Sequence, residues 1–278
     1  MTEHASLVTL ERRPDGVALI TIDNPPVNAL TTPLFAQLLA ITGELTASPP
    51  GAVVLAGRPK VFALGGEISE TYRVRFAGRT DIGDDELDDA VRAVTEPAYI
   101  RELGGKYLAT FDALAAVPCM VIAAITGITF GGGLELALAC DYRVASERAK
   151  LGAPEVTLGG GSIGGGVFRL PRLIGPSMAK KMYLGGLPVS AREALRIGLV
   201  DEVADADGTV ARALELARSF TAYAGPAQAG LKRLIDAGYG LSGAEAGALE
   251  LDAWCASYAT DDARARLREF FARGPAAD

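Results

Sequence analysis

The chain has 278 residues and a formal net charge of −7, from 27 basic and 34 acidic side chains. That length suits one large domain, or one domain with a sizeable appendage. Hydrophobic residues make up 49% of the chain, which predicts a large core or apolar surface buried between subunits. No Lys/Arg run exceeds two residues, which argues against a nucleic-acid partner. No apolar run reaches membrane-span length and no signal-peptide pattern is seen, so a cytoplasmic protein without membrane attachment is expected.

The first part of the chain indicates a hairpin, a loop, a helix and a buried strand. The hairpin is predicted because the turn "PDG" lies between residues 7–13 and residues 17–23. These two segments are either apolar or alternate between apolar and polar residues. The segment "NPPVNAL" (24–30) is predicted to be loop, because proline interrupts a strand ladder. A helix is predicted to follow, capped by Thr32. Residues 52–56 predict a short buried strand, which is followed by a predicted loop.

The middle of the chain continues this alternation of strands and helices. Residues 81–116 have helical apolar spacing, and Pro97 is expected to end or kink the first helix. The run "CMVIAAI" predicts a buried strand, residues 134–140 a helix and residues 142–146 another strand. Strands alternating with helices predict an α/β domain.

The C-terminal part has a different character, because from about residue 208 to 274 only helical patterns occur. We therefore predict a catalytic core over residues 1–205 and a helical C-terminal region over residues 206–278. This region is expected to serve oligomerisation or to form a lid.

The histidine and cysteine content limits the chemistry. His4 is the one histidine of the sequence and lies in a terminal tail, which excludes a Ser-His-Asp triad, a Cys-His pair and a histidine zinc site. Cys119, Cys140 and Cys255 are far apart in apolar contexts and are interpreted as small core residues. Catalysis would rest on carboxylates, backbone amides, Tyr, Lys or a cofactor.

Two carboxylates are candidates for such chemistry. Glu135 lies in an apolar helix with almost no polar face, so a position at a solvated edge is the weaker interpretation. Glu155 follows a proline and, taken alone, could be a capping or turn residue. A buried carboxyl has a raised pKa, which suits proton transfer near neutral pH. Two carboxyls across a small gap are an arrangement for acid–base work on water.

Three glycine-rich segments are candidate ligand contacts. The "GGG" at 131–133 begins a helix and would expose its first N–H groups, although close packing of helix on strand is the alternative. Together with "LGGEI" at 64–68 it could form an oxyanion hole. The run "GGGSIGGG" (159–166) lacks the P-loop and dinucleotide patterns and is interpreted as a flexible turn that contacts a ligand.

Several motifs in the same order resemble the crotonase family, whose type member is enoyl-CoA hydratase. The motifs are "NPPVNAL", "VFALGGEI", "ITGITFGGGLELALACDYRVAS", "LGAPEVTLG", "GLVDEV" and "ATDDAR". The resemblance covers most of the chain. It implies an α/β core of repeated strand–strand–helix turns with a C-terminal helical oligomerisation region. It also implies an acyl-CoA thioester substrate, no metal or redox cofactor, and a homotrimer or dimer of trimers.

The resemblance also implies roles for individual residues. The amides of Gly66 and Gly132 would form the oxyanion hole. Glu135 and Glu155 would be the two glutamates of a hydratase, one activating water and the other delivering a proton to the α-carbon. The implied substrate-binding residues are Val27, Ala63, Leu64, Gly65, Glu67, Ile68 and Ile163, the last through its backbone amide. Retention of both glutamates favours hydration of a 2-enoyl-CoA to a 3-hydroxyacyl-CoA, or the reverse.

The sequence departs from the family pattern at three places, and two other functions stay open. Glu67 stands where the family has Asp, Ser162 and Ile163 replace the usual Pro and Gly, and the segment 69–117 is longer than expected in simple hydratases. The first alternative is a double-bond isomerase that uses Glu155 alone. The second is a non-catalytic acyl-CoA-binding subunit.

Overall fold

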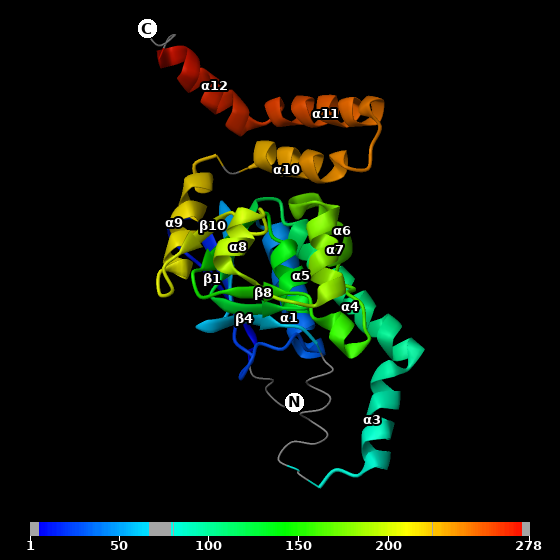
Figure 1. Cartoon of the computed structure of the whole chain (residues 1–278). Coiled ribbons are helices and arrows are strands. Elements are labelled where there is room, and N and C mark those ends of the chain that lie inside the picture. Colours follow the sequence, from blue (N-terminus) through cyan, green and yellow to red (C-terminus); the bar gives the residue numbers. More distant parts are fainter. Residues whose placement is uncertain (1–5, 67–78, 80, 224, 274–278) are drawn as a thin grey trace, which may run out of the picture.

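The computed structural model describes residues 6–66, 79, 81–223 and 225–273 (Figure 1). The strands are β1 (Val8–Arg12), β2 (Val17–Ile22), β3 (Ala52–Ala56), β4 (Lys60–Leu64), β5 (Met120–Ile125), β6 (Gly127–Phe130), β7 (Tyr142–Ser146), β8 (Lys150–Gly152), β9 (Val189–Ser190) and β10 (Glu202–Ala204). The helices are α1 (Thr32–Ala47), α3 (Asp84–Thr95), α4 (Pro97–Ala115), α5 (Gly132–Leu138), the 3₁₀ helix η1 (Glu155–Leu158), α6 (Gly166–Ile174), α7 (Pro176–Gly185), α8 (Ala191–Arg196), α9 (Thr209–Thr221), α10 (Pro226–Gly238), α11 (Gly243–Tyr258) and α12 (Asp261–Arg273).

Consecutive strands are divided between two sheets, which gives the fold its repeat. In the described part of the chain, one sheet has the order β1-β2-β3-β5-β7-β10 and the other β4-β6-β8-β9. Each repeat places one strand in the larger sheet and the next in the smaller one, and then adds helix: β3 and β4 before α3 and α4, β5 and β6 before α5, β7 and β8 before η1 and α6. The predicted α/β strand–strand–helix fold is thus confirmed.

The larger sheet is held by strands that are buried on both faces. The side chains of β3 and all but the first residue of β5 are buried. Continuous apolar runs of this kind are typical of a parallel sheet covered on both sides, and β3 does pair parallel with β5. On one face the core includes Leu34 and Leu38 of α1 and Phe111 of α4, while on the other face Ala213 and Ala217 of α9 complete a second cluster.

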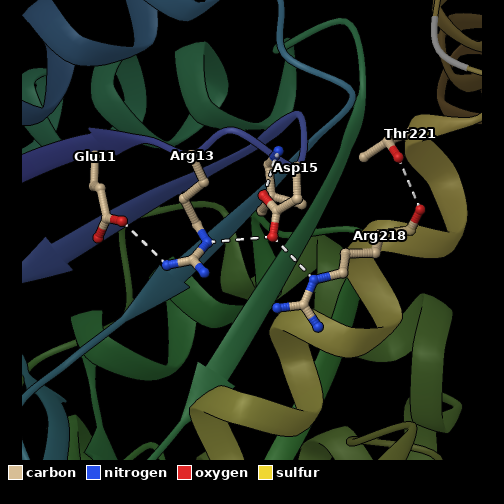
Figure 2. Close-up of polar contacts among 6 residues, drawn as sticks. Glu11, Arg13, Asp15, Arg218 and Thr221 are labelled. Atoms are coloured by element: carbon tan, nitrogen blue, oxygen red, sulfur yellow. Dashed lines mark hydrogen bonds and ion pairs between the residues drawn. The ribbon is translucent and has the colours of Figure 1, made fainter.

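Helix α9 is tied back to the N-terminal hairpin by charged side chains (Figure 2). Arg218 Nε lies 2.9 Å from Asp15 Oδ2 in the turn between β1 and β2, and Arg13 Nε lies 3.5 Å from the same oxygen. The Arg218 guanidinium is the main cause that holds the pKa of Asp15 below its ordinary value. The ion pair therefore joins the start of the larger sheet to the helix that covers one of its faces.

The C-terminal helices extend away from this core. Lys232 of α10 places its Nζ 2.7 Å from Asp141 Oδ2 and 3.0 Å from the carbonyl oxygen of Cys119, which fixes α10 to the core. Beyond it, α11 and α12 lie away from the two sheets (Figure 1). Their exposed side chains include Leu251, Trp254, Tyr258, Phe270 and Phe271. The predicted helices of this region are confirmed, whereas its separation from the core at residue 205 stays a prediction.

The smaller sheet was not predicted from the sequence. The segment after β3 was expected to be loop, but residues 60–64 form β4, and β6 and β8 were also missed. Strands β6 and β8 have only four and three residues, which is too short for a clear alternation. Strand β4 has five residues, but only Phe62 and Ala63 of them are buried. In addition, Gly127 pairs in register with Lys60 of β4, and only a residue without a Cβ can lie against that backbone.

Three smaller expectations were wrong. The N-cap of α1 is Thr31 rather than Thr32, because Thr32 already has helical conformation. Helix α5 begins at Gly132 and ends at Leu138, two residues before the predicted range at each end. Cys119 and Cys140 are buried as expected, but Cys255 is exposed, because α11 buries Ala253 and leaves the cysteine outside the core. Among the described residues no helix is long and apolar enough to cross a membrane.

Candidate active site

The ends of three strands of the smaller sheet bring the candidate residues together. Leu64 of β4 pairs in register with Phe130 of β6, and Phe130 pairs with Gly152 of β8. All three strands are parallel, so the residues that follow them emerge at one edge of the sheet, where open α/β sheets bind ligands. These following segments carry the predicted oxyanion-hole glycines and the two predicted glutamates. The topology therefore places the sequence motifs at one site.

The triple glycine is required both by packing and by backbone conformation. A Cβ on Gly133 would collide with the carbonyl oxygen of Ala63, so α5 lies directly on β4. Gly131 has φ +57°, a conformation that favours glycine, and its N–H donates to the carbonyl oxygen of Gly152 at 2.9 Å. Close packing of helix on strand, the alternative interpretation of this segment, therefore explains part of the glycine run. It also leaves Gly132 and Gly133, the first two residues of α5, without side chains beside the site.

Glu135 is buried in the site rather than placed at a solvated helix edge. Only 2% of the residue is exposed. Its Oε1 accepts a hydrogen bond of 2.9 Å from the backbone N–H of Gly166, at the start of α6. A Cβ on Gly164 would lie 3.0 Å from its Oε2, so the turn between η1 and α6 closes over the carboxyl.

Glu155 lies across from Glu135 at the first residue of η1. A Cβ on Gly131 would lie 3.2 Å from its Oε1, which puts this carboxyl beside the N-terminus of α5. Burial raises the pKa of Glu155, and the charge of Glu135 raises it further. The structure therefore brings the two glutamates close enough for the charge of Glu135 to act on Glu155, and it favours the protonated form of Glu155.

The predicted oxyanion hole contains a side chain that was not predicted to lie there. The N–H of Gly66 donates a hydrogen bond of 3.0 Å to the hydroxyl of Tyr107. A Cβ on Gly132 would lie 3.2 Å from the same hydroxyl, so both glycines border the phenol. The Tyr107 ring is buried between Phe35 and Phe111, with which it makes edge contacts at centroid distances of 4.6 and 5.5 Å.

The predicted substrate-binding residues near β4 also lie beside the site. The N–H of Leu64 donates to the carbonyl oxygen of Val27 at 3.2 Å, and the N–H of Gly65 donates to that of Phe130 at 2.9 Å. The loop 24–30 is therefore fastened to the end of β4, next to Ala63. Glu67 and Ile68, predicted to contact the substrate, and His4 lie outside the described residues.

Ile163 is exposed, unlike the buried Glu135. Its side chain is 49% exposed and packs on α4, since a Cβ on Gly104 would lie 2.8 Å from its Cγ1. The turn that carries Ile163 thus contacts α4, which belongs to the long segment that precedes β5. In this way two of the three departures from the family pattern, the Ser162–Ile163 turn and the extended 69–117 region, meet in the structure.

Sequence reasoning missed three side chains of the site. Tyr107 was interpreted only as part of an apolar helix face, and Tyr183 of α7 was not singled out. Ser162 was noted only as a departure from the family pattern. Ser162 and Tyr183 line, with Glu155, a cavity of about 390 Å³. No periodicity marks such residues, because each is an ordinary member of its own turn or helix.

Comparison with known proteins of similar sequence identifies the family of the chain. The family model described as enoyl-CoA hydratase/isomerase matches residues 12–100 and 86–276. A probable enoyl-CoA hydratase of Mycobacterium avium is 32% identical over 247 residues, covering 88% of each chain. A peroxisomal bifunctional enzyme of Danio rerio is 40% identical over 204 residues, 73% of this chain, but this chain spans about a quarter of that relative's length.

Solved structures of similar fold include further enoyl-CoA hydratases. DspI of Pseudomonas aeruginosa has a TM-score of 0.83 and 30% identity, over 98% of this chain and 96% of that one. An enoyl-CoA hydratase from Bacillus anthracis has a TM-score of 0.80 and 28% identity, over 96% of each chain. The fold, the family model and these relatives confirm the crotonase resemblance, and the chain belongs to the enoyl-CoA hydratase/isomerase family.

Proposed function

We propose that the protein adds water to a 2-enoyl-CoA thioester to give a 3-hydroxyacyl-CoA, or catalyses the reverse dehydration. The observation that carries this proposal is the pairing of Glu135 and Glu155. Glu135 is buried at the site and held by the Gly166 amide. Glu155 has a raised pKa, owing to burial and to the charge of Glu135. Two carboxyls in different environments suit a reaction that needs both a base and an acid.

The environments of the two carboxyls assign their roles in the proposed reaction. Glu135, whose carboxyl group is held in place by the Gly166 amide, takes a proton from water while the water oxygen bonds to C3. The electrons of the C2–C3 double bond move to the thioester oxygen, which the amides of Gly66 and Gly132 stabilise. Protonated Glu155 then delivers its proton to C2, and proton exchange with water returns both carboxyls to their starting states.

CoA enters this scheme as part of the substrate, and no metal or redox cofactor takes part in it. The proposed assembly is a homotrimer or a dimer of trimers. The exposed apolar side chains of α11 and α12, including Trp254, Tyr258 and Phe270, support burial of this region between subunits.

The product formed from defined substrates tests the proposed function. The protein is incubated with 2-enoyl-CoAs of different chain lengths and with a 3-enoyl-CoA, and products are identified by chromatography and mass spectrometry. Accumulation of 3-hydroxyacyl-CoA from a 2-enoyl-CoA supports the hydratase. Conversion of the 3-enoyl-CoA to its 2-enoyl isomer without any hydroxyacyl product supports the isomerase instead, and binding without turnover supports the non-catalytic subunit.

Tyr107→Phe is expected to tighten the binding of a saturated acyl-CoA by roughly two- to tenfold. In the free protein the Tyr107 hydroxyl accepts the Gly66 hydrogen bond that the thioester oxygen needs. A ligand that must first displace an internal partner loses affinity, and removal of that partner restores it. Calorimetric titration measures the change. Tyr99→Phe, on the same helix, is the control. Weaker binding together with a lower kcat would mean that the hydroxyl instead donates to the thioester.

A further inference from the structure

A cavity adjoins Glu155 on the side formed by η1, the turn 159–165, α6 and α7. Its volume is about 390 Å³. Most of its wall is apolar, with contributions from Ala153, Val156, Val167, Pro171, Ala179 and Leu184. Against this background the side chains of Glu155, Ser162 and Tyr183 place three oxygen-bearing groups on one cavity.

The oxygen atoms of those three groups are buried. Within the described part of the chain, Glu155 Oε2, Ser162 Oγ and Tyr183 Oη are buried atoms, and none has a protein partner at hydrogen-bond geometry. Burial raises the pKa of both Glu155 and Tyr183, and the Ser162 hydroxyl, a polar neighbour of each, opposes part of that rise. Buried polar atoms without a partner are rare in folded proteins and costly. Three of them around one cavity indicate that they serve a bound oxygen.

The Tyr183 hydroxyl also approaches the second glutamate. A Cβ on Gly166 would collide with Tyr183 Oη and would lie 2.9 Å from Glu135 Oε1, so both oxygens approach the same point of α6. Burial raises the pKa of Tyr183 to about 12, and the charges of Glu135 and Glu155 act in the same direction. The phenol therefore keeps its proton at neutral pH and is a hydrogen-bond donor between the two carboxyls.

We propose that Ser162 and Tyr183 bind the oxygen at C3 of the substrate, so that the site recognises the hydroxyl group of a 3-hydroxyacyl-CoA. This inference rests on the proposed function, because it takes Glu135 and Glu155 as the groups on either side of C3. Tyr183 donates its O–H to the C3 oxygen, and Ser162 connects the same oxygen to Glu155. The two hydroxyls are specificity residues: they distinguish an acyl chain with oxygen at C3 from one without it.

The test compares the binding of two thioesters that differ only in this hydroxyl group. In the Glu135→Gln background, which is expected to prevent turnover, the dissociation constants of a 3-hydroxyacyl-CoA and of the saturated acyl-CoA of equal length are measured by calorimetry. Adding Tyr183→Phe is expected to weaken binding of the hydroxy ligand by about five- to tenfold and that of the saturated ligand by less than about twofold. Ser162→Ala is expected to act in the same direction. Tyr223→Phe, at an exposed tyrosine, should change neither constant.

The outcomes separate this inference from the proposed function. Equal weakening of both ligands by Tyr183→Phe, or no change in either, overturns the assignment of Tyr183 and leaves the hydratase proposal standing. Failure of the Glu135→Gln parent to bind either thioester counts against the acyl-CoA site itself, and with it against both proposals. Selective loss of the hydroxy ligand, in both the Tyr183 and the Ser162 variant, supports the inference.

Discussion

Glu135→Gln is expected to lower kcat by about 100- to 10,000-fold, the range typical of losing a general acid or base. The carboxamide has nearly the shape of the carboxylate, and its oxygen can still accept the 2.9 Å hydrogen bond from the Gly166 amide. It cannot take a proton from water. The fold and the affinity for a saturated acyl-CoA are therefore expected to persist, and the consumption of 2-enoyl-CoA, followed by absorbance, measures the loss.

A matched control for this variant is Glu147→Gln, at an exposed glutamate in the turn after β7. It makes the same chemical change outside the site and is expected to retain full activity. Thermal melting and acyl-CoA titration of both variants show whether fold and binding are intact. If Glu135→Gln retains most of the kcat, Glu135 is a structural carboxylate and the hydratase proposal fails.

Glu155→Gln is expected to reduce turnover as strongly as Glu135→Gln, and the double variant little more than either single one. Groups that act as a unit in one step have non-additive effects on rate. The isomerase alternative makes a different prediction. In that mechanism only Glu155 is needed, so Glu135→Gln would retain the activity. Comparison of kcat for the two single variants and the double variant distinguishes the two cases.

The pH dependence of the rate follows from the same residue. The pKa of Glu155 is raised, chiefly by burial and also by the charge of Glu135. Its carboxyl therefore stays protonated to a higher pH than an exposed glutamate, and the rate of proton delivery to C2 falls as the pH rises through this raised value. This decline at high pH is expected in the wild-type profile and should be absent from the residual activity of Glu155→Gln.

The central strands β3 and β5 of the larger sheet could be predicted from the sequence because they are apolar along their whole length. The predicted ranges 52–56 and 142–146 match β3 and β7, and the continuous apolar run of β3 is typical of a strand covered on both faces. The smaller sheet could not be predicted in the same way. Its strands are short and contain Gly127 and Gly152, and their register depends on contacts between segments far apart in the chain.

The candidate site was predictable only in part. Glu135 is conspicuous because it lies in a helix whose other residues are all apolar, small or glycine, so its burial could be inferred. Tyr107 and Tyr183 are not conspicuous, because an amphipathic helix commonly has a tyrosine at the margin of its apolar face. That α4 and α7 direct these two hydroxyls to the glycines and glutamates is a result of tertiary packing. No local pattern specifies it.

The origin of the atoms added to the substrate tests the central claim most directly. A 2-enoyl-CoA is incubated with the protein in ¹⁸O-labelled D₂O, and the product is analysed by mass spectrometry and NMR. The two-glutamate mechanism predicts a 3-hydroxyacyl-CoA with one ¹⁸O at C3 and one deuterium at C2, and no such product with Glu135→Gln or Glu155→Gln. A product with deuterium but without ¹⁸O, formed equally well by Glu135→Gln, would contradict hydration and establish proton transfer between carbons as the reaction.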